Sequence, residues 1–145
     1  MPRRFVYVIA FKDDKFAMVL HKLRAWEMPG GRLDWHDDSY EVAAIREFRE
    51  ETGYGLQVIG EVLGLEPRSE GRVLVGLVKD DPPKKVTDPK IAEVCFFDGL
   101  PRELSFPEVE YISMLAQAKR ILETFKKGKA ISASASPLTQ AEATE

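Results

Sequence analysis

Apolar runs and short polar breaks alternate along the first part of the chain. The runs RFVYVIAF (4–11) and FAMVLH (16–21) are rich in β-branched and aromatic residues, and the polar stretch KDDK separates them. Apolar runs of this length are typical of buried strands, and a short polar break favours an antiparallel return. The pattern predicts a β-hairpin over residues 4–21. A loop with a Pro-Gly-Gly core is expected over residues 22–38.

The period of the apolar positions then becomes helical. Asp38 and Glu41 have the spacing of a capping box, which places Asp38 at the N-cap. Gly53 is typical of the left-handed residue that ends a helix. A helix over residues 39–52 is therefore expected. Its packed face is predicted to consist of apolar residues at helical spacing, namely Val42, Ile45 and Phe48.

The remaining elements are strands and one further helix. Strands are predicted over 55–66, 72–79 and 91–97, with a proline-rich loop over 80–90 between the last two. The order β-β-α-β-β-β-α predicts an α+β fold, in which a mixed β-sheet packs between helices as an α/β/α sandwich.

The second helix begins near Pro107, because proline is favoured in the first helical turn. Its expected sheet-facing stripe is Ile112, Leu115, Leu122 and Phe125. Beyond it, few bulky apolar residues remain, which predicts a flexible C-terminal tail over residues 128–145. We therefore expect one folded domain over residues 1–127 and a low-complexity tail.

Composition narrows the class of protein. The chain has 145 residues, 44% of them hydrophobic, with a net charge of −3 and a single cysteine. This charge gives no electrostatic reason for general binding to nucleic acid or membranes. One cysteine cannot form an internal disulfide, which favours a reducing compartment. A cytoplasmic protein without a membrane partner is the expectation.

An acidic cluster dominates the predicted first helix. Glu47, Glu50 and Glu51 lie within an arc of about 100° on the helical wheel. Two carboxylates about 6 Å apart repel by about 3 kcal/mol at an effective dielectric constant of 20. Either the cluster is a solvated charged face, or it binds a hard divalent cation such as Mg²⁺ or Mn²⁺.

The surrounding sequence extends this cluster into a motif. GGRLDWHDDSYEVAAIREFREETGY (30–54) resembles the Nudix box, G-x5-E-x7-R-E-U-x-E-E-x-G-U, where U is apolar. The part REFREETGY fills the end of the box completely. Asp38 stands where the family has glutamate, and Gly31 lies one residue early, so the loop has one extra residue. The chain is thus similar to MutT-like Nudix hydrolases.

The resemblance implies hydrolysis of a nucleoside diphosphate linked to another moiety X. It implies that Glu47, Glu50 and Glu51 bind the metal, with the Gly31 carbonyl as a further ligand, and that Arg46 orients the glutamates. Asp38 would assist as N-cap or near the metal. For Glu93, inside the run IAEVCFF, two interpretations stay open: an outward-facing strand residue, or a base or extra metal ligand.

The sequence gives only candidates for the residues that contact substrate. Trp35 in the lengthened loop is a candidate for stacking a base, although core packing is the alternative. Arg24, Arg32 and Arg68 are candidates for phosphate contacts. A nucleoside triphosphate is the favoured substrate; the 5′ end of RNA and a homodimer also remain open.

Two other classes of function compete with the enzyme. A regulatory module would keep the fold and bind nucleotide while hydrolysing weakly or not at all, as the shifted glycine and Asp38 suggest. An interaction domain would use the acidic helix face to meet a basic protein surface, and would show no metal dependence. The complete REFREE stretch favours the enzyme.

Overall fold

The computed structural model describes residues 4–63 and 71–134. Within them the chain forms seven strands and two helices. The elements in chain order are β1 (Phe5–Lys12), β2 (Lys15–His21), β3 (Trp26–Glu27), β4 (Gly30–Arg32), α1 (Tyr40–Thr52), β5 (Leu56–Val62), β6 (Gly71–Val78), β7 (Ile91–Phe97) and α2 (Glu108–Ser134).

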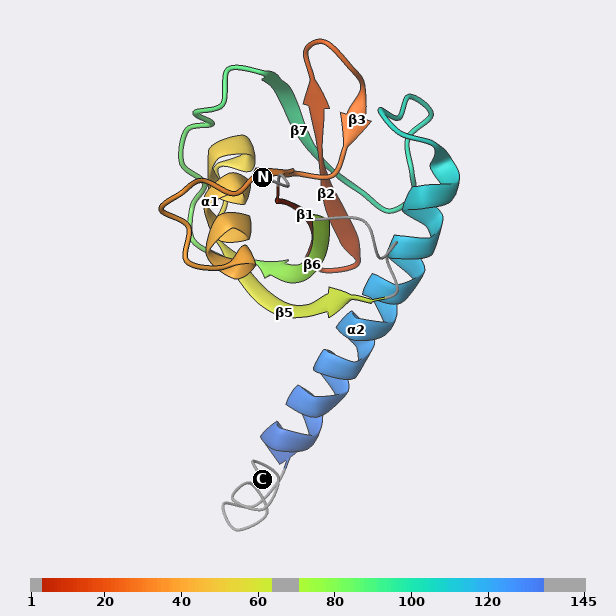
Figure 1. Cartoon of the computed structure of the whole chain (residues 1–145). Coiled ribbons are helices and arrows are strands. Elements are labelled where there is room, and N and C mark those ends of the chain that lie inside the picture. The colour runs from red at the N-terminus through yellow and green to blue at the C-terminus, as the bar shows by residue number, and fades with distance from the viewer. Residues whose placement is uncertain (1–3, 64–70, 135–145) are drawn as a thin grey trace.

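The strands form one mixed sheet. Its main path runs β3-β2-β1-β6-β5, with β4 also pairing with β1 and β7 with β2 (Figure 1). Strands β1 and β6 are parallel, and the other pairs are antiparallel. The predicted hairpin over 4–21 and the predicted mixed sheet are therefore confirmed.

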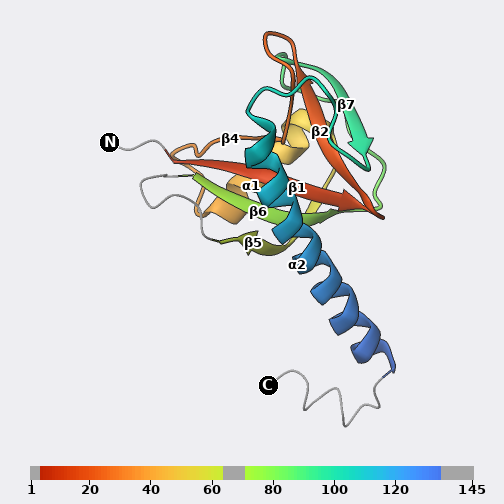
Figure 2. The ribbon, with the colours of Figure 1, turned by 90° about the vertical axis from the view of Figure 1, so that its right-hand side faces the viewer.

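Strand β1 is buried on both faces, and its alternation defines the layers. Val6, Val8 and Ala10 pack with α1 residues, whereas Ile9 and Phe11 pack with α2 residues. Because successive strand side chains point to opposite faces, one strand serves two cores. The helices thus cover opposite faces of the sheet, which is the expected α/β/α arrangement (Figures 1 and 2).

Two short strands lie where the sequence predicts only loop. Trp26 pairs with Leu20 in β2, and Gly30 pairs with Tyr7 in β1. A side chain at Gly30 would collide with the backbone of β1, so only glycine permits this close approach. The interval is too short and too rich in glycine for a periodic signal, which explains why β3 and β4 were missed.

Helix α2 differs from prediction in its stripe and its length. Ile112 is 53% exposed, so its assignment to the sheet-facing stripe was wrong. The buried residues recur at spacings of four, three and four: Tyr111, Leu115, Ala118 and Leu122. The helix continues to Ser134, so the predicted tail begins as helix, and residues 135–145 lie outside the described part.

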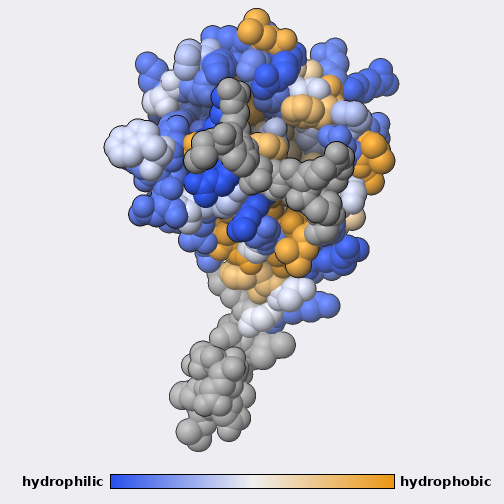
Figure 3. Space-filling model, in the orientation of Figure 1, coloured by the Kyte–Doolittle hydropathy of each residue, from blue (hydrophilic) through white to orange (hydrophobic). Residues whose placement is uncertain are grey.

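The surface is mostly hydrophilic, with apolar groups gathered where the body meets the projecting α2 (Figure 3). A groove of about 560 Å³ lies there between β5 and α2, lined in part by Ile59, Leu63 and Ile121. Among the described residues, no helix combines the length and the apolarity needed to cross a bilayer.

Candidate active site

Helix α1 carries the acidic cluster, and its caps determine where it begins and ends. Ser39 is the N-cap, and its hydroxyl accepts a 3.1 Å hydrogen bond from the Val42 N–H. The expected N-cap, Asp38, is exposed instead and lies one residue too early. Gly53 ends the helix with φ 82°, as predicted.

The packed face of α1 is not the predicted one. Val42 and Ile45 are 44% and 37% exposed, whereas Ala43, Ala44 and Phe48 are fully buried. The small alanines let the helix approach the sheet closely, so the packed face rotates toward the acids. Glu51 consequently points inward and is only 6% exposed. The assignment of Val42 and Ile45 to the packed face was therefore wrong, and that of Phe48 was right.

The two glycines of β4 receive the inward-facing glutamates. The Gly30 N–H donates a 2.7 Å hydrogen bond to Glu51 Oε1. A Cβ atom placed on Gly31 would lie 2.5 Å from Cδ of Glu47. The Pro-Gly-Gly sequence therefore brings bare backbone against the carboxylates, and a side chain at Gly31 would displace Glu47.

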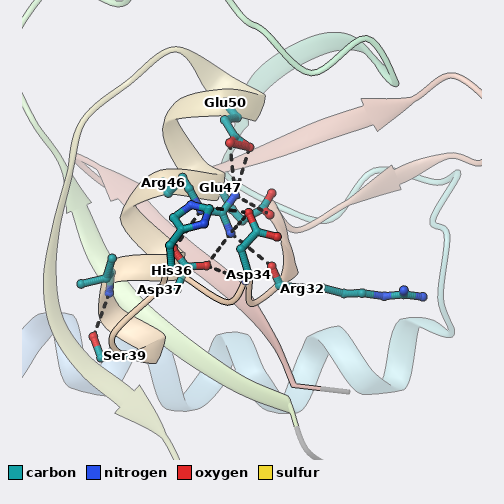
Figure 4. Close-up of polar contacts among 9 residues, drawn as sticks. Arg32, Asp34, His36, Asp37, Ser39, Arg46, Glu47 and Glu50 are labelled. Carbon is teal, nitrogen blue, oxygen red and sulfur yellow. Dashed lines mark hydrogen bonds and ion pairs between the residues drawn. The ribbon is translucent and has the colours of Figure 1, made fainter. Parts of the chain in front are cut away.

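Arg46 is the centre of an ion-pair network (Figure 4). It donates two hydrogen bonds to Asp37, of 2.7 and 3.0 Å. It also reaches Glu47 at 3.1 Å, and both carboxylate oxygens of Glu50 at 3.1 and 3.2 Å. The expected contacts of Arg46 with these glutamates are present. Asp34 also belongs to the network, with its Oδ2 atom 3.5 Å from Nη2 of Arg46.

Asp37 was not predicted from the sequence, yet it anchors this network. Its side chain is 1% exposed, and its Oδ2 also accepts a 2.8 Å hydrogen bond from the Asp34 N–H. The hydrogen bonds from Arg46 lower the pKa of Asp37, and in return Asp37, followed by Glu50, raises the pKa of Arg46. Asp37 and Arg46 therefore both carry their charges at ordinary pH values.

Glu47 and Glu51 have the opposite electrostatic character. Burial raises the pKa of Glu47 to about 7, which Arg46 only partly offsets. Burial raises the pKa of Glu51 to about 8, against the lowering effect of the Gly30 N–H. The charged forms of these two carboxylates therefore lack sufficient positive charge nearby.

A divalent cation would supply that charge. The available donors are carboxylate oxygens, the hard ligands that Mg²⁺ and Mn²⁺ prefer, and the absence of a side chain at Gly31 lets the Glu47 carboxylate lie against its backbone. Across the described residues, no three acidic, histidine or cysteine side chains already converge as a complete ligand set. Glu50 faces Arg46 and Glu51 faces Gly30. The residues thus fit the cation by the chemistry of their oxygens, which are held by protein donors in this arrangement.

The loop between β6 and β7 brings a further acid to the site. Both Thr87 and Asp88 donate backbone hydrogen bonds, of 3.0 and 3.1 Å, to the Glu50 carbonyl. The charge of Asp88 contributes to the raised pKa of Glu47 and of Glu51. Asp88 was missed because it lies in a proline-rich loop, and only the tertiary contact places it near the helix.

The other predicted site residues are dispersed. Glu93 is exposed on β7, opposite Leu20 of β2. Trp35 is 96% exposed, and its one ring contact among the described residues is a T-shaped contact with His36. The Arg32 carbonyl accepts a hydrogen bond from Arg46, while the Arg32 side chain points away from the cluster (Figure 4).

Arg24 is the remaining described candidate for phosphate binding. It forms a two-pronged pair with Glu27, at 2.8 and 3.0 Å, so its guanidinium already has an acidic partner. Arg68 lies outside the described residues. The structure therefore brings together Arg46, Glu47, Glu50, Glu51 and Gly31, and it is Asp37, not the predicted Asp38, that joins them by pairing with Arg46.

Comparison with solved structures identifies similar folds. The MutT NUDIX hydrolase of Burkholderia pseudomallei is 25% identical, with a TM-score of 0.56, and the match covers 81% of this chain and 98% of that one. The Bacillus subtilis pyrophosphohydrolase BsRppH is also 25% identical, with a TM-score of 0.64 and coverage of 81% and 82%.

A third similar structure is larger. A bifunctional NMN adenylyltransferase/ADP ribose pyrophosphatase from Francisella tularensis, complexed with AMP and a Mn ion, is 21% identical, with a TM-score of 0.50. The match covers 88% of this chain and 42% of that one. No match was found among curated proteins.

The sequence itself matches the NUDIX domain over residues 1–113, most of its length. This match includes β4, α1 and the loop that carries Asp88, and the solved structures above share the surrounding fold. The chain therefore belongs to the NUDIX family of hydrolases.

Proposed function

We propose that this protein hydrolyses a phosphoanhydride bond of a nucleoside diphosphate linked to a moiety X, and that X is most simply a further phosphate, as in a nucleoside triphosphate. The observation that carries the proposal is the acidic end of α1 held against Gly30 and Gly31 of β4. A solvated acidic face would not bury Glu51 or raise its pKa to about 8.

In this proposal Glu47, Glu50 and Glu51 hold Mg²⁺ or Mn²⁺. A cation held by these residues would supply positive charge to neutralise pyrophosphate oxygens and polarise the scissile P–O bond. Arg46 restrains the carboxylates of Glu47 and Glu50, and Asp37 in turn fixes Arg46. Such supporting contacts orient ligands that would otherwise lose entropy on binding.

Small nucleotides are the substrates most consistent with the relatives. The similar structures include a MutT hydrolase, a pyrophosphohydrolase, a UDP-X diphosphatase and an ADP-ribose pyrophosphatase. These share a phosphoanhydride next to a nucleoside and differ in the group beyond it. The 5′ end of a triphosphorylated RNA contains the same phosphoanhydride and is therefore a further candidate substrate.

The test is a hydrolysis panel with Mg²⁺, with released phosphate or pyrophosphate as the readout. It contains nucleoside triphosphates, ADP-ribose, a UDP-sugar and a 5′-triphosphorylated RNA. We expect turnover of at least one nucleoside triphosphate, with a higher kcat/KM than for the other compounds. Turnover of none of the panel, with nucleotide binding retained, would favour a binding module and refute the proposal.

The metal assignment has its own variant. Replacing Glu50→Gln keeps one acceptor for Arg46 but removes the charge, and we expect a loss of about a hundredfold in kcat, the size seen on removing one key electrostatic group. Glu41→Gln is the matched control, because Glu41 is exposed on the first turn of the same helix. Full activity in Glu50→Gln would contradict the assignment.

A further inference from the structure

Helix α2 carries a second apolar stripe, separate from the one that packs on the sheet. Val109 is 71% exposed and Ile112 is 53% exposed, and Ala116, one turn further on, is exposed as well. On a helical wheel these side chains fall within an arc of about 60°, turned by about 120° from the packed face. We name Val109, Ile112 and Ala116 the outer stripe. Figure 2 shows α2 as the outermost layer on this side of the sheet.

The outer stripe is a candidate contact surface for another protein chain. Apolar residues that are scattered singly over a surface need no explanation, whereas adjoining ones are typical of an interaction site. The spacings of three and four residues make the members of the outer stripe neighbours along the helix. A narrow stripe of this kind fits a second helix laid along the first.

The charges on either side of the outer stripe differ in sign. Residues 98–110 contain four acidic residues and one basic residue, whereas residues 119–128 contain four basic residues and one acidic residue. The helix dipole favours this order of charges only near the helix ends, and Lys119 and Arg120 lie in the middle of α2. The two halves of α2 are therefore complementary to a second copy that runs in the opposite direction.

The charged groups nearest the outer stripe are available for such a contact. Glu108, Lys119 and Arg120 are all exposed, and across the described part of the chain they have no ion-pair partner of their own. A partner helix could therefore pair with them without breaking a contact inside the chain.

The end of α2 also lacks support from its own chain. Its last turns extend beyond the body of the protein (Figure 1). Lys126, Lys127 and Gly128 are exposed there, and glycine is a poor helix former. A short helical extension is marginal in water without a packing partner. An antiparallel second copy would place this basic end beside the acidic residues 98–110 of that copy.

We propose that two copies of this chain associate through their α2 helices, packed antiparallel about a twofold axis with Ile112 facing Ala116 of the second copy. A small residue opposite a large one lets the two helices approach closely. The twofold axis generates each contact twice. The proposal does not depend on the proposed function, because the outer stripe contains none of the acidic-site residues.

This register pairs the residues that flank the outer stripe. Glu108 and Lys119 lie on one edge of it, about 20° apart on the wheel, and the twofold axis brings like edges together. Glu108 therefore lies beside Lys119 of the second copy. Val109 and Arg120 lie on the other edge, also about 20° apart, so the aliphatic stem of Arg120 covers Val109 of the second copy.

The experiment measures self-association by sedimentation equilibrium between about 1 and 200 μM protein. The proteins are the wild type, Ile112→Asp, Glu108→Lys, Lys119→Glu, the double variant Glu108→Lys/Lys119→Glu, and Glu110→Lys. The last is the matched control, because Glu110 is exposed in the same turn with the same charge but lies about 130° from the outer stripe. Circular dichroism checks that each variant is folded.

We expect a wild-type dimer with a Kd of about 10 μM, as for a small interface. Ile112→Asp should raise the Kd about a hundredfold, because two isoleucines lose their apolar contact. Each single charge reversal should raise it about tenfold, and the double reversal should restore it to within about threefold of the wild type. Glu110→Lys should match the wild type.

Hydrogen exchange gives a second measurement on the wild type. The backbone amides of residues 126–134 should exchange more slowly at about 200 μM than at about 1 μM, because the second copy supports the end of α2.

Three results would overturn the inference. A wild-type protein that stays monomeric at about 200 μM would leave the outer stripe to a different partner. A dimer that Ile112→Asp leaves unchanged would be held by another surface. Single charge reversals that weaken the dimer without recovery in the double variant would refute the antiparallel register.

Discussion

Removing the charge of Glu51 should stabilise the metal-free protein. Glu51 is 6% exposed, and its carboxylate has one neutral donor, the Gly30 N–H. Its pKa is raised from 4.5 to about 8, mainly by burial. The replacement Glu51→Gln keeps an oxygen acceptor for Gly30 while removing the charge.

The magnitude follows from proton linkage. A carboxyl with a raised pKa keeps its proton in the folded protein at pH values where the unfolded chain has released it. The free energy of unfolding therefore falls as the pH rises from about 4.5 to about 8, and is lowest above that window. A pH of 7 lies about 2.5 units above the unfolded-state pKa of 4.5, and at about 1.36 kcal/mol per unit this costs about 3 kcal/mol of stability.

The assay is urea unfolding with EDTA at several pH values. We expect the difference between Glu51→Gln and wild type to be near zero at pH 4.5 and to reach about 3 kcal/mol at pH 7. Glu123→Gln, an exposed change on α2, is the control and should follow the wild type. Added Mg²⁺ should stabilise wild type and the control, but Glu51→Gln less. Parallel pH profiles for Glu51→Gln and wild type would refute the reasoning.

Two further substitutions test the supports of the site. Gly53→Ala forces a side chain onto a backbone with φ 82° and against the backbone of the β6–β7 loop. The free energy of unfolding, measured by urea titration, should therefore fall by about 2 kcal/mol or more. For the control Gly99→Ala, where the new side chain meets open space, it should fall by less than about 0.5 kcal/mol. Asp37→Asn removes the charge that holds Arg46 and should lower kcat/KM about tenfold or more, while the exposed Asp38→Asn should leave it unchanged; equal effects of the two would show that the network does not matter for activity.

The sequence predicted the longer strands well because each is a run of apolar residues rich in β-branched and aromatic side chains. In β1 this run is continuous, so Val6 and Val8 can pack with α1 while Ile9 and Phe11 pack with α2. The packed face of α1 was not predictable in this way. Apolar character favoured Val42, whereas the space at the sheet selected the smaller alanines and brought acids inward.

The acidic site was predictable in its helix and not in its surroundings. The spacing of Glu47, Glu50 and Glu51 identified the candidates, because a helix fixes where its own residues point. Asp37 could not be distinguished from Asp38 by spacing, since one extra loop residue shifts the register. Only the buried contact with Arg46 decides between them.

The attachment of the β6–β7 loop to α1 has a consequence for sequence divergence. Its contacts are made by the backbone: Lys84 N–H to the Gly53 carbonyl, and the N–H groups of Thr87 and Asp88 to that of Glu50. Nearly any side chain can stand at position 84 or 87 without breaking them, but proline cannot, because it lacks the N–H. Homologues could therefore retain this attachment with no shared residue in the loop, and it would be recognised by the absence of proline at these positions rather than by identity.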